Sequence, residues 1–284
     1  MAKKKYLLER MTWPEAEEAF SRKPCVVVIP IGSTEQHGPH MPLGTDFLTA
    51  EEFARRLGER ADVIVTPTIP IGYAKYHTSF PGTLSVSEDT LANMLMEVCE
   101  DLVSYGATHI LFVNGHGGNM NAIRQCGEML RELGVPMAAA VYWKVIQVVN
   151  PDWLPIGHGD YVETSLVLAL DESLPNLAIA KIPTSKNLSD AISLDTPHDA
   201  RFNGGTVFVN LITADLTDSG DMLELGLSAA TNYDTPPTAA SKEMGDRIYD
   251  GVADYLACFV QEFSKVTLPP VDALGPLGKR RRGQ

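Results

Sequence analysis

The 284-residue chain is 44% hydrophobic and 21% charged, and it carries a formal net charge of −13. This composition is typical of a globular protein with a sizeable core, and the acidic balance argues against general nucleic-acid binding. The four cysteines are scattered without a CxxC pair, which argues against thiolate zinc binding and favours reduced cysteines in a cytoplasmic protein. Because neither a signal peptide nor an apolar run of ~18–20 residues is visible, we expect no contact with a membrane.

Predicted strands and helices alternate through residue 170. Apolar runs bounded by turn residues predict strands over residues 25–31, 62–67, 109–113 and 136–142. Helical periodicity predicts helices over residues 8–20, 47–60, 87–105, 120–133, 162–170 and about 239–263. This alternation predicts an α/β fold with a mainly parallel sheet and helices on both of its faces.

The remaining segments are less regular. Residues 150–160 read as a loop, and residues 181–215 are mixed, with a β-like run over residues 206–212. The final segment is rich in proline, glycine and basic residues. We therefore expect a single domain over residues 1–265 and a C-terminal tail or arm over residues 266–284.

The first predicted strand leads into residues 32–46, GSTEQHGPHMPLGTD, which hold a dense set of candidate metal ligands. Glu35 and His37 are two residues apart and face the same side of an extended backbone. The glycines and prolines that follow can turn the chain so that Asp46 comes back toward them. Carboxylates and imidazoles suit zinc, manganese or iron, so this stretch predicts a metal site. The alternative at this point is a polar surface loop.

Further candidates follow two later strands. His116 lies in the glycine-rich segment 114–119, NGHGGN, while His158 and Glu163 lie in or just after the loop over residues 150–160. A phosphate-binding loop is the weaker interpretation of the glycines, because the segment is not GxGxxG and no Lys-Ser/Thr follows. Since loops at the carboxyl ends of parallel strands meet at one edge of a sheet, we expect these side chains to converge with those of the first loop.

These motifs resemble the creatininase family of metal-dependent amidohydrolases. The resemblance rests on residues 32–46, on residues 114–119 and on residues 157–165, GHGDYVETS, in that order along the chain. It implies a three-layer α/β/α fold, a centre of two divalent ions and a hexamer, expected here as a homohexamer acting on a small molecule. Zn²⁺ is the first expectation for the ions, with Mn²⁺ or Fe²⁺ as alternatives.

The resemblance also implies roles for individual residues. It places Glu35, Asp46 and His116 around one ion, and His37 with a second carboxylate around the other, with Asp46 bridging the two. In creatininase itself the second carboxylate lies two positions after the glycine-rich histidine, where this chain has Gly118. We expect Glu163 to replace it.

Other residues are assigned to catalysis and to the substrate pocket. We expect His158, together with Glu163, to take part in catalysis, with His158 as an acid or base beside the ions; a hydrogen-bonded structural histidine is the alternative. His77, Tyr73 and Trp153 are the candidates for lining the substrate pocket.

The predicted function is a metal-dependent hydrolase that activates water for attack on a cyclic amide or another C–N bond of a small polar substrate. Gly118 argues against creatinine as that substrate. One alternative keeps the metal centre and cleaves a cyclic ketone of the inosose type or a lactone. A formamide deformylase and a non-catalytic metal-binding scaffold are the remaining alternatives.

Overall fold

The computed structural model describes residues 5–153, 156–181, 186–194, 196–221 and 235–274. Its centre is a four-stranded parallel sheet in the order β2-β1-β3-β4. These strands are β1 (Val26–Ile31), β2 (Ile64–Val65), β3 (His109–Asn114) and β4 (Met137–Val141). Every residue of β1 and β3 is buried, as expected for strands that are covered on both faces.

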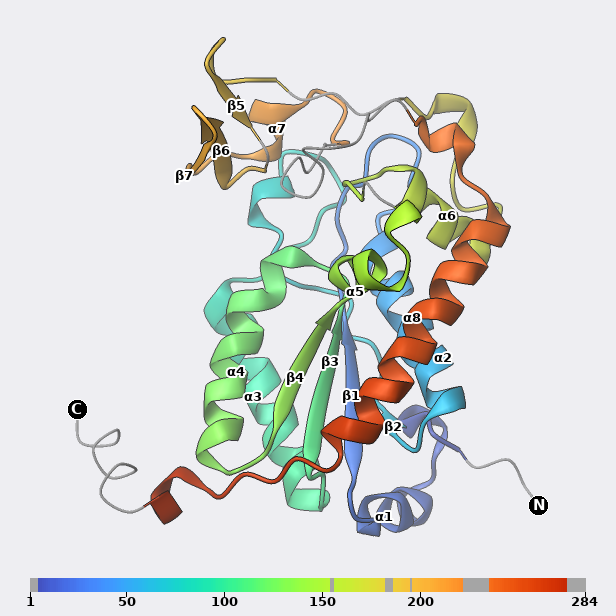
Figure 1. The fold of residues 1–284 in the computed structure, drawn as a ribbon, viewed down its shortest axis with the longest axis vertical. Helices are drawn as coiled ribbons and strands as arrows, with labels where there is room; N and C mark the ends of the chain where they lie inside the picture. The colour runs from blue at the N-terminus through green and yellow to red at the C-terminus, as the bar shows by residue number, and fades with distance from the viewer. Residues whose placement is uncertain (1–4, 154–155, 182–185, 195, 222–234, 275–284) are drawn as a thin grey trace.

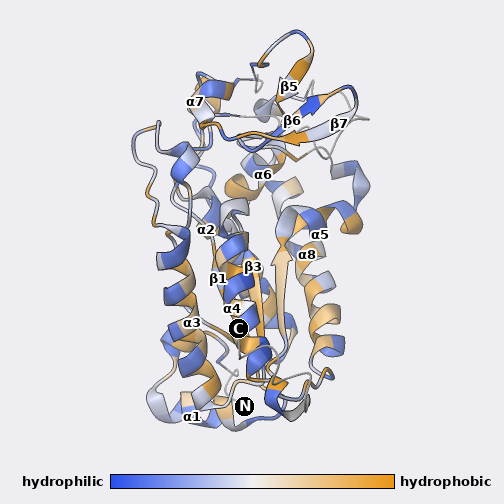
Figure 2. Ribbon diagram, turned by 90° about the vertical axis from the view of Figure 1, so that its left-hand side faces the viewer, coloured by the Kyte–Doolittle hydropathy of each residue, from blue (hydrophilic) through white to orange (hydrophobic). Residues whose placement is uncertain are grey.

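Helices cover both faces of this sheet, so the predicted three-layer α/β/α fold is confirmed (Figure 1). The helices are α1 (Trp13–Ser21), α2 (Thr45–Arg60), α3 (Glu88–Tyr105), α4 (Met120–Glu132), α5 (Tyr142–Val149), α6 (Tyr161–Leu170), α7 (Thr213–Leu216) and α8 (Lys242–Phe263). One core lies between the sheet and α2, α6 and α8, and the other lies between the sheet and α1, α3 and α4. The strands and the inward sides of α3 and α8 carry the hydrophobic residues of these cores (Figure 2).

A second, antiparallel sheet lies beyond the carboxyl ends of the central strands (Figure 1). It consists of β5 (Ile192–Leu194), β6 (Asp199–Phe202) and β7 (Gly205–Phe208), and α7 follows it in the chain. Leu194, Ala200 and Leu216 form a small core of their own beneath it. The predicted β-like run over residues 206–212 therefore corresponds to β7 and the residues that follow.

Several predicted boundaries differ from the structure. The predicted helix over residues 8–20 is interrupted, because Glu15 accepts a hydrogen bond from the backbone N–H of Thr12 and fixes the start of α1 there. The strand predicted over residues 62–67 shrinks to Ile64–Val65, since Pro67 has no N–H to extend the ladder. The predicted fourth strand ends at Val141, and the unpredicted helix α5 follows it directly.

The helix predicted over residues 87–105 begins and ends close to the expected residues, as α3. The Ser87 hydroxyl accepts a hydrogen bond from the N–H of Thr90 at the start of α3, and Gly106, with φ of 124°, ends that helix. Residues 266–274 of the predicted tail follow α8 and pack against the domain, where the Val266 carbonyl accepts a hydrogen bond from His109 at 2.8 Å. Among the described residues, no helix combines the length and the hydrophobicity needed to cross a membrane.

Candidate metal centre

Two loops leave the central sheet side by side. Ile31, the last residue of β1, pairs with Asn114, the last residue of β3, so the segments that follow these strands start at the same level. A Cβ atom on Gly115 would lie 2.3 Å from the backbone oxygen of Asp46, and only glycine permits this close approach. The pairing of β1 with β3 therefore positions Glu35, Asp46 and His116 at one edge of the sheet.

Glu35, Asp46 and His116 form the first potential ligand group, here called the Glu35 group. Nδ1 of His116 lies 3.1 Å from Oε2 of Glu35 and 3.1 Å from Oδ2 of Asp46. All three side chains are buried. Asp46 lies in the first turn of α2, so the start of that helix fixes the direction in which the Asp46 side chain points.

His37, Asp46 and Glu163 form the second potential ligand group, here called the Glu163 group. Nε2 of His37 lies 2.9 Å from Oδ1 of Asp46 and 3.8 Å from Oε2 of Glu163. Glu163 comes from the first turn of α6, which Asp160 caps by accepting hydrogen bonds from the N–H groups of Val162 and Glu163. Asp46 is common to both groups and turns one carboxylate oxygen to each.

Backbone carbonyls orient both imidazoles. Nδ1 of His37 lies 3.2 Å from the carbonyl oxygen of Glu35, and Nε2 of His116 lies 2.8 Å from that of Tyr73. Because a carbonyl only accepts, these nitrogens carry the hydrogens. Nε2 of His37 and Nδ1 of His116 therefore face the carboxylates, and these are the two nitrogens that could bind a metal ion. This arrangement is typical of histidines that bind metal ions.

Positive charge between the buried carboxylates would stabilise them. Burial lowers the pKa of His37, but Asp46 and Glu163 outweigh it and raise that pKa to about 10. Burial likewise lowers the pKa of His116, yet Glu35 and Asp46 raise it well above its usual value. Divalent cations would supply the positive charge that protons supply in the absence of metal.

The residues present fit a metal centre. Oε2 of Glu35, Nε2 of His37 and Oδ2 of Asp46 are buried and have no hydrogen-bond partner within the described part of the chain. Unsatisfied buried polar atoms are costly, and these three belong to the two ligand groups, in each of which the ligand atoms lie within 4.8 Å of one another. Carboxylate oxygen and imidazole nitrogen are donors for zinc, manganese and iron.

His158 and His77 stack beside the two groups. The His158 ring lies 4.0 Å from the His37 ring and 4.7 Å from the His77 ring, measured between centroids. Nε2 of His158 donates a hydrogen bond to the Gln36 carbonyl at 2.6 Å, which leaves Nδ1 as the basic nitrogen. Burial, together with the neighbouring His37, keeps the pKa of His158 well below its usual value, so this imidazole is neutral.

His77 contacts Glu35 rather than only facing the cavity. Its Nε2 lies 3.3 Å from Oε1 of Glu35, and its Nδ1 lies 2.7 Å from Oγ1 of Thr213 and 3.0 Å from Nε2 of Gln36. Thr213 belongs to α7, so this contact links the small sheet region to the ligand groups. Burial and the surrounding imidazoles hold the pKa of His77 well below its usual value.

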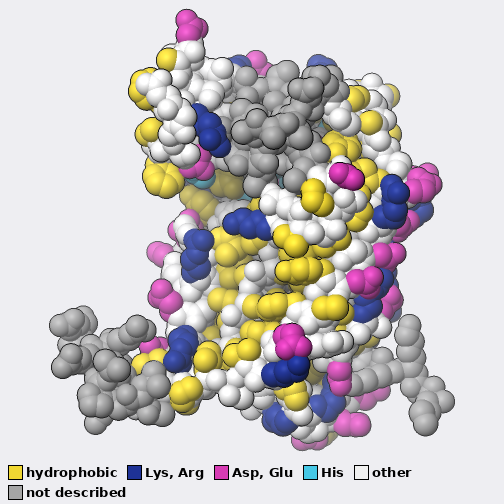
Figure 3. Space-filling view, viewed as in Figure 1, with side chains coloured by type: hydrophobic (Ala, Val, Ile, Leu, Met, Phe, Trp, Pro, Cys, Tyr) yellow, Lys and Arg dark blue, Asp and Glu magenta, His cyan; other side chains and the backbone are white. Residues whose placement is uncertain are grey.

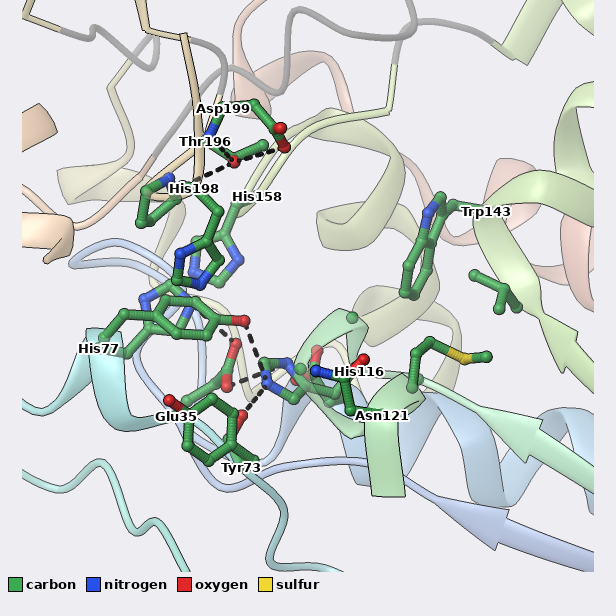
Figure 4. Close-up of a pocket in the computed structure, with 18 of the residues that line it drawn as sticks. Glu35, Tyr73, His77, His116, Asn121, Trp143, His158, Thr196, His198 and Asp199 are labelled. Carbon is green, nitrogen blue, oxygen red and sulfur yellow. Dashed lines mark hydrogen bonds and ion pairs between the residues drawn. The ribbon is translucent and has the colours of Figure 1, made fainter. Parts of the chain in front are cut away.

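A cavity of about 570 Å³ opens onto the ligand groups. Tyr73, Tyr76, His77, Trp143 and His158 line it, together with residues 196–199 and Phe208 from the region of the small sheet. Thr196 and Asp199 lie on the opposite side of the cavity from Tyr73 (Figure 4). In Figure 3 a hollow separates the small sheet from the body of the molecule at this level.

The structure does not bring Trp153 to this cavity. Its ring packs against the core on the side of α8, close to Gly251, and Trp143 in the first turn of α5 lines the cavity instead. The sequence placed Trp153 in a pocket loop, but Pro151–Trp153 forms a 3-10 turn that directs the ring toward α8.

Comparisons with known proteins agree on one family. The profile of creatininase (creatinine amidohydrolase) matches residues 9–260. Creatinine amidohydrolase of Pseudomonas putida is 33% identical over 196 residues, which cover 61% of this chain and 75% of that protein.

The chain belongs to the creatininase family.

Relatives in this family carry different names. The mycofactocin precursor peptide peptidase of Mycolicibacterium smegmatis is 36% identical over 149 residues, covering 50% of this chain and 57% of that protein. The 3-dehydro-scyllo-inosose hydrolase of Thermotoga maritima is 28% identical over 186 residues, covering 57% of this chain and 55% of that protein. The predicted family and the predicted class, a metal-dependent hydrolase, are confirmed.

Solved creatininase structures share the fold over almost the whole chain. A variant creatininase of Zn–Zn type superposes with a TM-score of 0.72 at 26% identity, covering 93% of this chain and 100% of that one. A manganese form of creatininase gives a TM-score of 0.71 at 26% identity with the same coverage. The use of divalent metal by this family agrees with the ligand groups found here.

Gly118, where the resemblance implied a carboxylate, has no room for a side chain in this structure. A Cβ atom at this position would lie 2.1 Å from the Tyr73 carbonyl oxygen and 2.6 Å from Nε2 of His116. The hydrogen bond between His116 and Tyr73 therefore occupies the space that a side chain would need. Glu163 comes from α6 instead, and its Oε1 accepts a hydrogen bond from the Tyr142 hydroxyl at 2.6 Å.

Sequence reasoning missed several residues of the site. Tyr142 holds Glu163, Gln36 joins His77 to His158, and the Tyr76 hydroxyl lies 3.3 Å from Nε2 of His116. Gln36 lies inside the first motif and could have been singled out by its position between Glu35 and His37. Tyr76 directly precedes His77, which the sequence assigned to the pocket, and could have been found in the same way. Tyr142 comes from a segment without a motif, so the sequence offered no comparable signal for it.

Proposed function

We propose that this protein is a binuclear metal hydrolase that cleaves a C–N bond, such as that of a cyclic amide, in a small polar substrate. The Glu35 group and the Glu163 group would each hold one divalent ion, Zn²⁺ first and Mn²⁺ or Fe²⁺ as alternatives. The single observation that carries this proposal is Asp46, whose two carboxylate oxygens face two separate imidazoles at 2.9 and 3.1 Å. A shared carboxylate is what two adjacent ions require.

Several protein groups would hold the ligand side chains in place around the ions. When bound, the ions would supply an activated water and a polarised carbonyl at neutral pH. Tyr142 and the N–H of Gly159 hold the two oxygens of Glu163 at 2.6 and 2.7 Å, and the Tyr73 carbonyl holds His116. These contacts hold the ligand side chains in place.

His158 is the proposed acid and base. It is neutral, it lines the cavity and its Nδ1 is left basic by the hydrogen bond from Nε2 to Gln36. A neutral imidazole can take a proton from the attacking water and pass it to the leaving nitrogen. A metal ion in place of the proton on His37 would keep His158 neutral in the same way, because it also places positive charge next to the ring.

A cyclic ketone of the inosose type is the second candidate substrate. The similarity to an inosose hydrolase favours it, as does the absence of the creatininase carboxylate at Gly118. The similarity to creatinine amidohydrolase and to a peptide peptidase favours a C–N bond instead. We rank the C–N bond first because Gly118 affects which side chain holds the second ion, not the nature of the proposed nucleophile.

A substrate panel tests the proposal. Protein loaded with Zn²⁺ or Mn²⁺ is incubated with creatinine, a neutral lactam, short peptides, a formamide and a keto-inositol, and products are quantified by mass spectrometry. We expect turnover of an amide, with a loss of ~10³-fold or more in Glu35→Gln because one ion would lose its ligand. Turnover of the keto-inositol alone would support the second candidate. Equal turnover by Glu35→Gln would contradict the metal mechanism.

The homohexamer and the cytoplasmic location stay predictions. So does the division into a domain over residues 1–265 and a tail. Analytical ultracentrifugation of the full chain would measure the oligomeric state directly.

A further inference from the structure

Two basic side chains line the cavity away from the ligand groups. Arg124 lies in α4 and Lys144 in the first turn of α5, and both contribute to the cavity wall near Trp143. Basic side chains flank the hollow below the small sheet (Figure 3). They are the two Lys or Arg side chains of a cavity whose described lining also holds five carboxylates, on a chain with a formal net charge of −13.

Neither side chain forms an ion pair with a described residue. Among the residues the structure describes, the Arg124 guanidinium has one polar contact, with Oδ1 of Asn121 at 3.1 Å, and Lys144 has none. The arginines of α2 behave differently, since Arg55, Arg56 and Arg60 each pair with a carboxylate. Among the described residues, Arg124 and Lys144 therefore have no carboxylate as an ion-pair partner.

Two further carboxylates of the cavity wall accept hydrogen bonds from neutral side chains. Glu88 accepts a hydrogen bond from Nδ2 of Asn121 at 3.1 Å, and Asp199 accepts one from the Thr196 hydroxyl at 3.2 Å. Glu35, Asp46 and Glu163 belong to the ligand groups. Two divalent ions would more than offset the charge of those three carboxylates, which leaves Arg124 and Lys144 free to attract an anion.

We propose that Arg124 and Lys144 bind an anionic group, a carboxylate or a phosphate, on the substrate that is hydrolysed at the metal centre. This inference rests on the proposed function and names the class of its substrate. Arginine presents a planar fork that binds either anion through paired hydrogen bonds, and lysine adds a compact charge beside it.

The body of such a substrate would lie along Trp143. A Cβ atom on Gly117 would lie 3.8 Å from Cζ2 of Trp143, so the indole stands over the backbone next to His116. Figure 4 shows Trp143 across the cavity from His77 and His158. Trp143 is adjacent to Lys144 in the chain and lines the same cavity, so its apolar ring offers a surface for the body of a substrate whose anionic end contacts the basic pair.

A matched pair of small lactams tests this inference. Pyroglutamate carries a carboxylate, whereas 2-pyrrolidinone is the same ring without one. Isothermal titration calorimetry on Zn²⁺-loaded protein at low salt measures the Kd of each, with inorganic phosphate as a third probe. We expect pyroglutamate to bind at least about tenfold more tightly than 2-pyrrolidinone in the wild type.

The variant R124Q/K144Q should bring this ratio to about twofold or less while the metal content stays the same. The single variants R124Q and K144Q should give intermediate ratios. The control R10Q/K265Q removes the same charge outside the cavity, and we expect it to keep the wild-type ratio. Tighter binding of phosphate than of pyroglutamate, lost in R124Q/K144Q, would also support the inference and would identify the anion as a phosphate.

Two results would overturn the inference. One is a wild-type preference for pyroglutamate that R124Q/K144Q retains, because the metal ions alone would then bind the carboxylate. The other is that neither anion binds the wild type. Turnover in the substrate panel is a separate measurement. Amide hydrolysis, together with a ratio of the two Kd values that R124Q/K144Q leaves unchanged, would contradict the anion site and leave the proposed function intact. Loss of the ratio without any turnover would support the anion site and contradict the hydrolase.

Discussion

Glu163 is the residue through which this chain completes its second ligand group. Its carboxylate lies 3.8 Å from Nε2 of His37 and is held by Tyr142 and by the N–H of Gly159. The variant Glu163→Gln keeps the shape and removes the charge. We expect it to keep about one divalent ion per chain in place of two, because a neutral amide is a weak ligand. Mass spectrometry of metal content measures this.

The matched control is Glu97→Gln, an exposed position on α3 that lies far from the ligand groups. It should keep the wild-type metal content. Two ions per chain in Glu163→Gln would show that another residue fills the place left by Gly118.

Gly118 and its neighbour Gly117 offer a second comparison at the residue scale. A Cβ atom at Gly118 would lie 2.1 Å from the Tyr73 carbonyl, whereas at Gly117 the nearest atom, in Trp143, is 3.8 Å away. Gly118→Ala should therefore displace the carbonyl that orients His116 and weaken metal binding by about 10–100-fold. Gly117→Ala should change metal affinity little. Titration of apo protein with Zn²⁺ against a competing chelator distinguishes them, and equal affinities would contradict this account.

The convergence of the candidate ligand residues was predictable from sequence, whereas the cavity walls were not. Glu35, His37 and Asp46 share one motif, and the ends of parallel strands bring His116 to them, so residue type and strand order were sufficient. Trp143 and Trp153 could not be distinguished, because which ring faces the cavity depends on the unpredicted helix α5 and on the turn after it. Those short elements lack a periodicity that a sequence pattern can reveal.

At the scale of elements, α2 and α8 are joined by a network around Arg56. Its guanidinium lies 2.7 Å from Glu52, 2.7 Å from Asp246 and 3.0 Å from Asp250, and it stands 5.0 Å from the centroid of the Tyr249 ring. Only 13% of the Arg56 side chain is exposed. Arg56→Met should therefore lower the free energy of unfolding by about 1–3 kcal/mol, measured by urea denaturation.

Lys265→Met is the control for this network. Lys265 pairs with Glu262 on the surface, with side chains 66% and 75% exposed, so its loss should cost at most about 0.5 kcal/mol. Equal effects of the two substitutions would show that the Arg56 network contributes no more than a surface pair.

The same network predicts a pH dependence. Burial raises the pKa of Glu52, but hydrogen bonds from Arg55 and Arg56 outweigh it and bring that pKa below its ordinary value. The network therefore stabilises the fold fully above the unfolded-state pKa of about 4.3 and loses this effect as the pH falls further. The difference in unfolding free energy between wild type and Arg56→Met should shrink from about pH 6 to about pH 3.5. A difference that stays constant over this range would contradict the assignment.

The long elements were also the predictable ones. The strands β1 and β3 are continuous apolar runs, and α2, α3, α4 and α8 are amphipathic, so local patterns determine them. Strand β2 is two residues long because Pro67 ends its ladder, and such a short pairing depends on the neighbouring strand rather than on its own sequence. The antiparallel sheet β5–β7 is similarly held by pairing between distant segments.

For the whole molecule, the buried carboxylates link folding to metal. Glu35, Asp46 and Glu163 are buried next to one another, and this arrangement, which would bind metal ions, exists only in the folded chain. Protein stripped with EDTA should therefore unfold at a lower temperature, and Zn²⁺ at ~100 times its Kd should restore about 2.7 kcal/mol per site. Calorimetric scans of stripped and reloaded protein measure this. An unchanged Tm would contradict a metal centre at these residues.

Metal stoichiometry in Asp46→Asn tests the central claim most directly, because both ligand groups share Asp46. Protein purified without added metal is analysed by inductively coupled plasma mass spectrometry, and circular dichroism confirms that the variant is folded. We predict about two divalent ions per wild-type chain and fewer than one per Asp46→Asn chain, with loss of hydrolysis. A folded Asp46→Asn protein that keeps two ions, or a metal-free wild type that keeps its hydrolytic activity, would contradict the binuclear centre.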